Sequence, residues 1–109
     1  MAGTKKKERE RLSIPLHGVI YPEGDAWIAH CLEMDIVAEG NTSTEALDNV
    51  MDLIDFQVET ALDVGDIESI FRPAPPEIWK MFWLAEDRPV RRRPPTPVES
   101  FQARELALA

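Results

Sequence analysis

The stretch that decides the fold is GNTSTEALDNVMDLIDFQVETALDVG, residues 40–65. Thr42 and Glu45 stand three positions apart, the spacing of a capping box, which satisfies free backbone N–H groups at a helix start. This spacing predicts a helix that begins at Ser43, and Gly65 predicts its end. The apolar residues between them share one face, as expected for a helix packed on a sheet. They are Leu47, Val50, Met51, Ile54, Val58, Ala61 and Leu62.

A second set of residues in the same helix is acidic and recurs every three or four positions, on a ridge away from the apolar face. The acidic ridge consists of Glu45, Asp48, Asp52, Asp55, Glu59 and Asp63, with no Lys or Arg between them. Like charges at these spacings each cost roughly 0.2–0.5 kcal/mol, and the last two acids lie at the unfavourable end of the helix dipole. A basic partner would relieve this repulsion. The first five acids are therefore the predicted partner-binding residues, and an ordinary solvated surface is the alternative.

Three segments before this helix predict β-strands. Residues 12–21 alternate between apolar and polar positions, and Pro15 places that strand, at least locally, at an edge or a bulge. Residues 26–32 read as the returning strand of a hairpin, and residues 36–39 as a short third strand. The predicted fold is α+β: a three-stranded antiparallel sheet covered by one main helix, with a further helix and strand after it.

The remaining third of the chain predicts a short aromatic helix at residues 77–86, a basic proline-rich linker at 89–97 and a last strand at 98–108. The apolar residues of this helix fall on one face and need a surface to bury against. Core packing is one use for them, and an oligomer contact is the other. The predicted oligomer-contact residues are Trp79, Phe82 and Trp83.

Length and charge define the organisation of the chain. The 109 residues allow one domain, predicted at residues 12–71, with a flexible basic tail at 1–11 and a C-terminal extension at 72–109. The net charge is −8, and residues 12–71 contain thirteen acids and no Lys or Arg. Such a field favours cationic partners and disfavours direct binding of nucleic acid. No segment is long and apolar enough to span a membrane, which predicts a cytoplasmic protein.

The sequence predicts no catalytic site, no metal site and no cofactor. Cys31 is the single cysteine and the two histidines are scattered, so no zinc ligand set is present. His30 and Cys31 are adjacent in a strand and point to opposite faces. Carboxylates near the second and third strands could bind a metal or act as acid and base, but no catalytic motif accompanies them. Those carboxylates are Asp25, Glu33, Asp35 and Glu39, near His17 and His30.

The three consecutive arginines at 91–93 allow two uses. They could grip phosphates, or they could fold over the acidic helix and neutralise it. The aromatic side chains that single-strand binders interleave for base stacking are absent from this segment.

Three segments of the chain together resemble the HicB-like antitoxin family: YPEGDAWIA at 21–29, CLEMD at 31–35 and AEGNTSTEALDN at 38–49. The order of residues 40–47 carries most of the resemblance, which extends over about residues 12–63. It implies a non-enzymatic β-β-β-α-β domain, built as a partial RNase H-like scaffold without its active site.

The resemblance also implies a partner, a small basic toxin of HicA type that cleaves mRNA and is masked by the antitoxin. Many family members add a helix-turn-helix or ribbon-helix-helix module, which we do not find after Phe71, so direct DNA binding is not expected. The loop at 32–36 also departs from the usual proline-glycine pattern. A solitary HicB-like domain with a structural or regulatory role and no toxin is the alternative.

Overall fold

The computed structural model describes residues 14–94 and 98–106. The predicted basic tail at 1–11 lies outside the described residues. The elements are β1 (Ile14–Glu23), β2 (Ala26–Cys31), β3 (Ile36–Gly40), α2 (Ser43–Val64), the 3₁₀ helix η1 (Ile67–Ile70), α3 (Pro76–Leu84), β4 (Glu86–Arg88) and β5 (Val98–Glu105).

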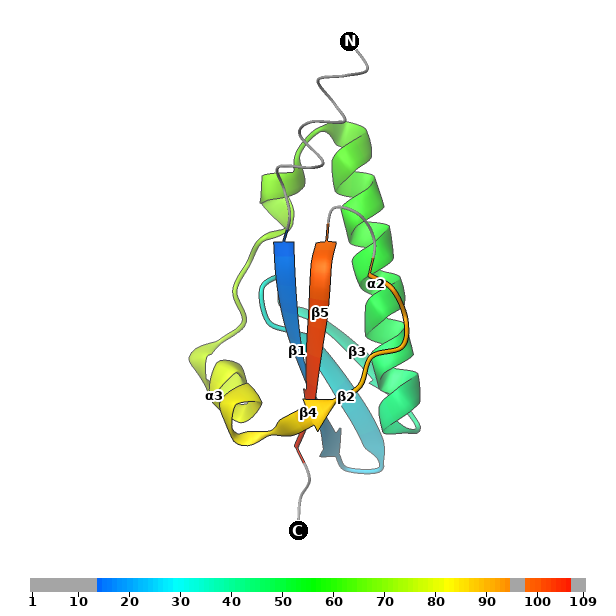
Figure 1. Ribbon diagram of the computed structural model, residues 1–109, viewed down its shortest axis with the longest axis vertical. Helices are drawn as coiled ribbons and strands as arrows, with labels where there is room; N and C mark the ends of the chain where they lie inside the picture. The colour runs from blue at the N-terminus through cyan, green and yellow to red at the C-terminus, as the bar shows by residue number, and fades with distance from the viewer. Residues whose placement is uncertain (1–13, 95–97, 107–109) are drawn as a thin grey trace.

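The strands form one five-stranded mixed sheet in the order β3-β2-β1-β5-β4 (Figure 1). The first three strands make the predicted antiparallel meander. β5 then pairs with β1 in parallel, and β4 pairs with β5 in antiparallel fashion. The α+β prediction is confirmed, and β1 is a central strand of the completed sheet.

Helix α2 begins and ends at the predicted residues. The backbone N–H of Glu45 donates to Oγ1 of Thr42 over 3.0 Å, which caps the first turn. At the other end Gly65 adopts a φ of 73°, and its N–H donates to the carbonyls of Ala61 and Leu62. The left-handed conformation at Gly65 carries no steric penalty because glycine has no Cβ.

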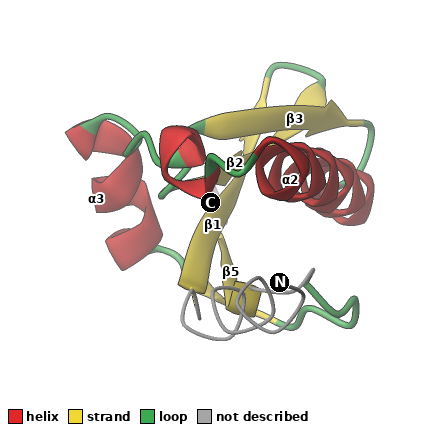
Figure 2. Ribbon diagram, turned by 90° about the horizontal axis from the view of Figure 1, so that it is seen from above, coloured by secondary structure: helices red, strands yellow, loops and turns green. Residues whose placement is uncertain are grey.

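The two helices cover opposite faces of the sheet (Figure 2). α2 lies on the face formed by alternate residues of β1 and β2, including Leu16, Ile20 and Ala29. Its buried residues include six of the seven in the predicted apolar stripe, and Leu62 is partly buried against the same core. α3 covers the other face, where Phe82 packs with Val19 and Leu32 in a smaller cluster.

The C-terminal part differs from the sequence prediction in two details. The aromatic helix ends at Leu84, and Glu86 to Arg88 form the unpredicted strand β4 on the sheet edge. β5 matches its predicted start, but its register with β1 shifts between Ile14 and Pro15. This irregularity places Val98 with Phe101 and Ala103 in the core under α2, whereas strict alternation along a regular strand would put Val98 on the opposite side from the other two.

Pro15 lies at this same irregularity and not at a free edge of the sheet, so of the two placements expected for it, the bulge is the one observed. Within residues 14–94 and 98–106, no helix has the length and apolar character needed to cross a membrane.

Candidate protein-interaction surface

The acidic ridge lies on the outward side of α2, as its spacing predicts. Five of its six carboxylate residues are exposed, and Asp55 is half-buried. Within the described residues, only two of the six form ion pairs, Asp52 and Asp55, and both pair with Arg92. The side chains of the other four carry no ion pair in that part of the chain. They are Glu45, Asp48, Glu59 and Asp63.

Arg92 reaches this ridge from the linker between β4 and β5. Its Nη1 lies 2.6 Å from Oδ1 of Asp52, and its Nη2 lies 2.5 Å from Oδ2 of Asp55. Nη1 also donates to the backbone carbonyl of Asp48 over 3.2 Å. Of the two uses predicted for the arginines, Arg92 shows the second, because it folds over the acidic helix, while Arg91 and Arg93 are exposed.

The contacts of Arg92 with the acidic ridge raise its pKa. The hydrogen bond to Asp52 is the main cause that raises the pKa of Arg92 above its ordinary value; partial burial opposes this, and the charge of Asp55 adds to it. The guanidinium therefore stays charged at all accessible pH values, and the contact responds to salt concentration.

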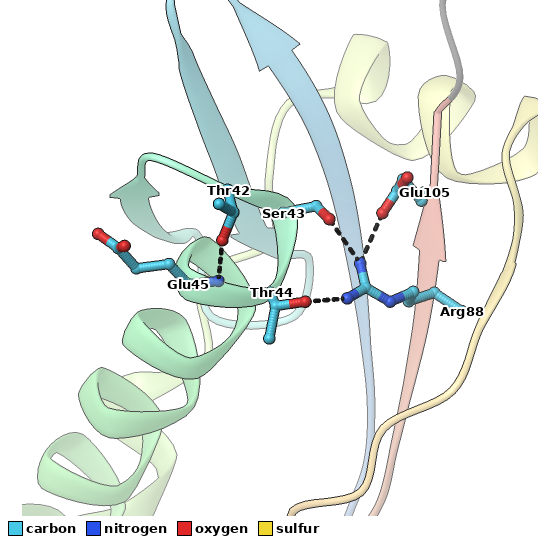
Figure 3. A network of polar contacts seen from close by, with 6 residues as sticks. All are labelled: Thr42, Ser43, Thr44, Glu45, Arg88 and Glu105. Atoms are coloured by element: carbon cyan, nitrogen blue, oxygen red, sulfur yellow. Dashed lines mark hydrogen bonds and ion pairs between the residues drawn. The ribbon is translucent and has the colours of Figure 1, made fainter.

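A second arginine fixes the linker at its start, beside the first turn of α2 (Figure 3). Nη1 of Arg88 donates to Oγ of Ser43 over 3.0 Å and to Oε1 of Glu105 over 2.5 Å. Its Nη2 donates to Oγ1 of Thr44 over 2.6 Å. Arg88 thus connects β4, β5 and α2. Arg88, the last residue of β4, and the following linker residues 89–94 are together called the arginine strap below.

Exposed apolar side chains accompany the acids on the outer side of α2. Phe56 is 66% exposed, and Leu53 and Val64 are also exposed. Phe56 stands four positions after Asp52 and three before Glu59, so these side chains are neighbours on the helix surface. Sequence reasoning missed this feature, although the signal was present: an aromatic residue that lies off the apolar stripe.

The aromatic residues of α3 divide between core and surface. Phe82 is 1% exposed and packs within the chain's own fold, whereas Trp83 is 66% exposed and Trp79 is half-buried. The guanidinium of Arg104 lies 4.4 Å from the ring centre of Phe82 and 5.6 Å from that of Trp83. Of the three predicted oligomer-contact residues, Phe82 therefore serves the core, and Trp83 presents the largest free surface.

A groove of about 840 Å³ runs beside this helix. Proline and tryptophan side chains line much of it, with Lys80 and Asp35 contributing charge. The lining residues are Asp35, Pro73, Ala74, Pro75, Pro76, Trp79, Lys80, Trp83 and Leu84.

The carboxylates considered for acid and base chemistry include two that bind histidines. Glu33 accepts from the backbone N–H of His17 over 2.7 Å, and its second oxygen lies 2.5 Å from Nδ1 of the same residue. Asp35 lies 2.6 Å from Nε2 of the buried His30. These pairs tie the turn after β2 to the two strands. Among the residues described, no group of three or more His, Cys, Asp or Glu side chains is placed to hold a metal ion.

Cys31 is fully buried under α2, while His30 lies on the other face of the strand, as the alternation predicts. Burial is the main cause that raises the pKa of the Cys31 thiol to about 12, and the charge of Glu33 adds to it. The thiol is therefore neutral and a poor nucleophile.

Comparisons of the chain with known protein families, with curated proteins and with solved structures found no match.

Proposed function

We propose that this chain is a HicB-like antitoxin module that acts in the cytoplasm by binding and masking a small, basic, RNA-cleaving protein of HicA type. The observation that carries the proposal is the outer side of α2, where Phe56 is 66% exposed among acidic side chains. Aromatic anchors surrounded by charge are typical of protein-binding surfaces, and the exposed Leu53 and Val64 lie on the same outer side of the helix. The β-β-β-α order and the parallel return of β5 also support the resemblance.

Binding at this surface would use charge and apolar contact together. The acids with no ion pair in the described chain attract a basic protein and raise its rate of association. Phe56 then supplies apolar area that only a complementary pocket can bury. No step in this mechanism requires a catalytic residue, a metal or a cofactor of the antitoxin.

The test is a calorimetric titration of the chain against a purified basic toxin of HicA type. Phe56→Ala is expected to weaken binding by about tenfold to a hundredfold, because an aromatic anchor contributes about 1–3 kcal/mol. Glu59→Lys is also expected to weaken binding, and the loss of affinity is expected to be larger at low salt than at high salt. Glu77→Lys on α3 makes the same change of net charge on the opposite face and serves as the control. Equal affinities for the wild type and all three variants would refute the proposal.

A second candidate is a solitary binding module that self-associates through α3. The exposed Trp83 and Leu84 beside the 840 Å³ groove favour it, because an apolar surface of this kind is normally covered by a second protein. Light scattering tests it: a wild-type dimer and a monomeric Trp83→Glu variant are the expected result. A wild-type monomer at high concentration would exclude this candidate without touching the proposal for α2.

A further inference from the structure

The arginine strap runs along α2, and its contacts follow the helix in order (Figure 1). Arg88 binds the first turn through Ser43 and Thr44, and Arg92 binds two turns further on, at Asp52. Eight helical residues rise about 12 Å. Four extended residues span about 13 Å. The spacing of the two arginines along the strap is therefore similar to the spacing of their contacts along the helix.

An apolar contact holds the strap between these two arginines. Val90 packs against the core cluster under α2. Beside it lies a hollow of about 680 Å³, lined by residues that include Leu47, Met51 and Arg91. Asp48 and Arg92 also line this hollow, so a side chain from another protein that enters it meets Arg92.

The contact made by Arg92 is of a kind that exchanges readily. The side chains of Arg92 and Asp55 are each 35% exposed, and that of Asp52 is 65% exposed. Ion pairs in such positions are weakly favourable because water competes for both partners. On both sides of Arg92, the described residues 89–94 form no helix or strand.

We propose that Arg92 is an internal competitor for the acidic ridge: a basic partner binds by placing an arginine of its own at Asp52 and Asp55 in place of Arg92. This inference rests on the proposed function only in assuming that the partner is basic. A partner must displace Arg92 before it can use the centre of the ridge, so Arg92 lowers the affinity of every cationic ligand by about the strength of a surface ion pair. A partner that also buries Phe56 offsets this loss.

The experiment uses a nona-arginine peptide as the probe and fluorescence anisotropy as the readout, in low salt, with the full chain. Arg92→Gln is compared with Arg91→Gln, which makes the same change of net charge at an exposed neighbour. We expect Arg92→Gln to bind the peptide about threefold to tenfold more tightly than Arg91→Gln, a gain of the size of one surface ion pair. In an Asp52→Asn, Asp55→Asn background the two arginine variants are expected to bind equally.

Two outcomes would overturn the inference: equal affinities of the two variants in the native background, or a difference that survives in the Asp52→Asn, Asp55→Asn background. If Arg92→Gln unfolds, Arg92→Lys decides the question, because it keeps the charge but loses the two-pronged geometry; binding no tighter than wild type would then count against a competitor. No toxin is used, so this result stands apart from the test of the antitoxin proposal.

Discussion

Each face of the sheet is covered by one helix, but the residues buried under the two helices differ in chemistry. Under α2 the core consists of aliphatic, methionine, cysteine, alanine and phenylalanine side chains, covered by a helix of 22 residues. Under α3, a helix of nine residues, the cluster is smaller and polar groups enter it. His17 meets the ring of Phe82 edge-on with 5.4 Å between ring centres, and Arg104 lies over the same ring. The core residues under the long helix are almost completely buried, whereas on the short helix Trp83 stays 66% exposed.

The pairing of acidic with basic side chains also differs between the two sides of the sheet. The outer surface of α2 concentrates acids, and the only base paired with them in the described residues is Arg92. On the α3 side, bases and acids pair locally, as Arg104 does with Asp87 over 3.2 Å. The acidic ridge on α2 therefore keeps most of its negative charge, whereas on the α3 side the charge of Arg104 is paired with that of Asp87.

The largest expected effect concerns the reactivity of the Cys31 thiol, which is buried under α2. A thiol pKa of about 12, against 9.0 for an ordinary thiol, lowers the thiolate fraction of Cys31 at pH 8 by on the order of a thousandfold. We therefore expect a thiol reagent at pH 8 to react at least that much more slowly with the native chain than with the chain in denaturant. Reaction at the same rate in both conditions would show that water reaches this face.

The same shift gives a pH dependence with a definite sign. The folded chain keeps the thiol proton at a pH where the unfolded chain has lost it, so unfolding releases a proton above pH 9. The contribution of Cys31 to stability is therefore complete below pH 9 and falls as pH rises toward about 12. Cys31→Ala is expected to remove this part of the alkaline slope in denaturant titrations.

The next effect measures packing on the α2 face. Ile54 is completely buried at the centre of the helix stripe, and Ile54→Ala is expected to lower the free energy of unfolding by about 2–5 kcal/mol. Urea titration gives this value, with an unchanged slope if the denatured state is unaffected. Leu53→Ala, one position away and exposed, is the matched control. A loss below 1 kcal/mol for Ile54→Ala would indicate that this face is loosely packed.

The smallest expected effect concerns the mixed cluster. Phe82→Leu keeps most of the apolar volume but removes the ring that His17 and Arg104 contact, at a cost of about 1–2 kcal/mol. Leu84→Ala is the control at an exposed position of the same helix, with a change expected within about 0.5 kcal/mol. Equal losses for the two variants would mean that the contacts of Phe82 are not what holds α3 to the sheet.

The α2 side was predictable because local signals determine it. Thr42 and Gly65 mark the ends of the helix, and the spacing of its apolar residues identifies the covered face. The acidic ridge follows from the same periodicity. Folding of arginines 91–93 over this helix was one of the two predicted uses. The sequence does not reveal that Arg92 makes the contact, or with which acids, because the contact joins segments that are distant in the sequence.

The other side was less predictable because it depends on pairing between distant strands. Strand β4 has only three residues, all charged, and exists because β5 offers it an edge. The position of Val98 follows from the irregular pairing near Pro15. Because of this shift, Val98 lies on the opposite face of the sheet from the one that strict alternation assigns to it. The split between Phe82 and Trp83 likewise depends on where α3 docks on the sheet, and helical periodicity places both on one face.

The parallel pairing of β1 with β5 has a consequence for the order in which the molecule forms. Gly18 in β1 leaves space that the ring of Phe101 in β5 fills, so the centre of the sheet is complete only when the two far ends of the chain have met. Contacts over such sequence separations slow folding, because loop closure costs entropy before the pairing compensates for it. During synthesis, β1 must therefore wait with one edge open until β5 has left the ribosome. In that interval the unpaired edge of β1 is open to wrong strand pairing.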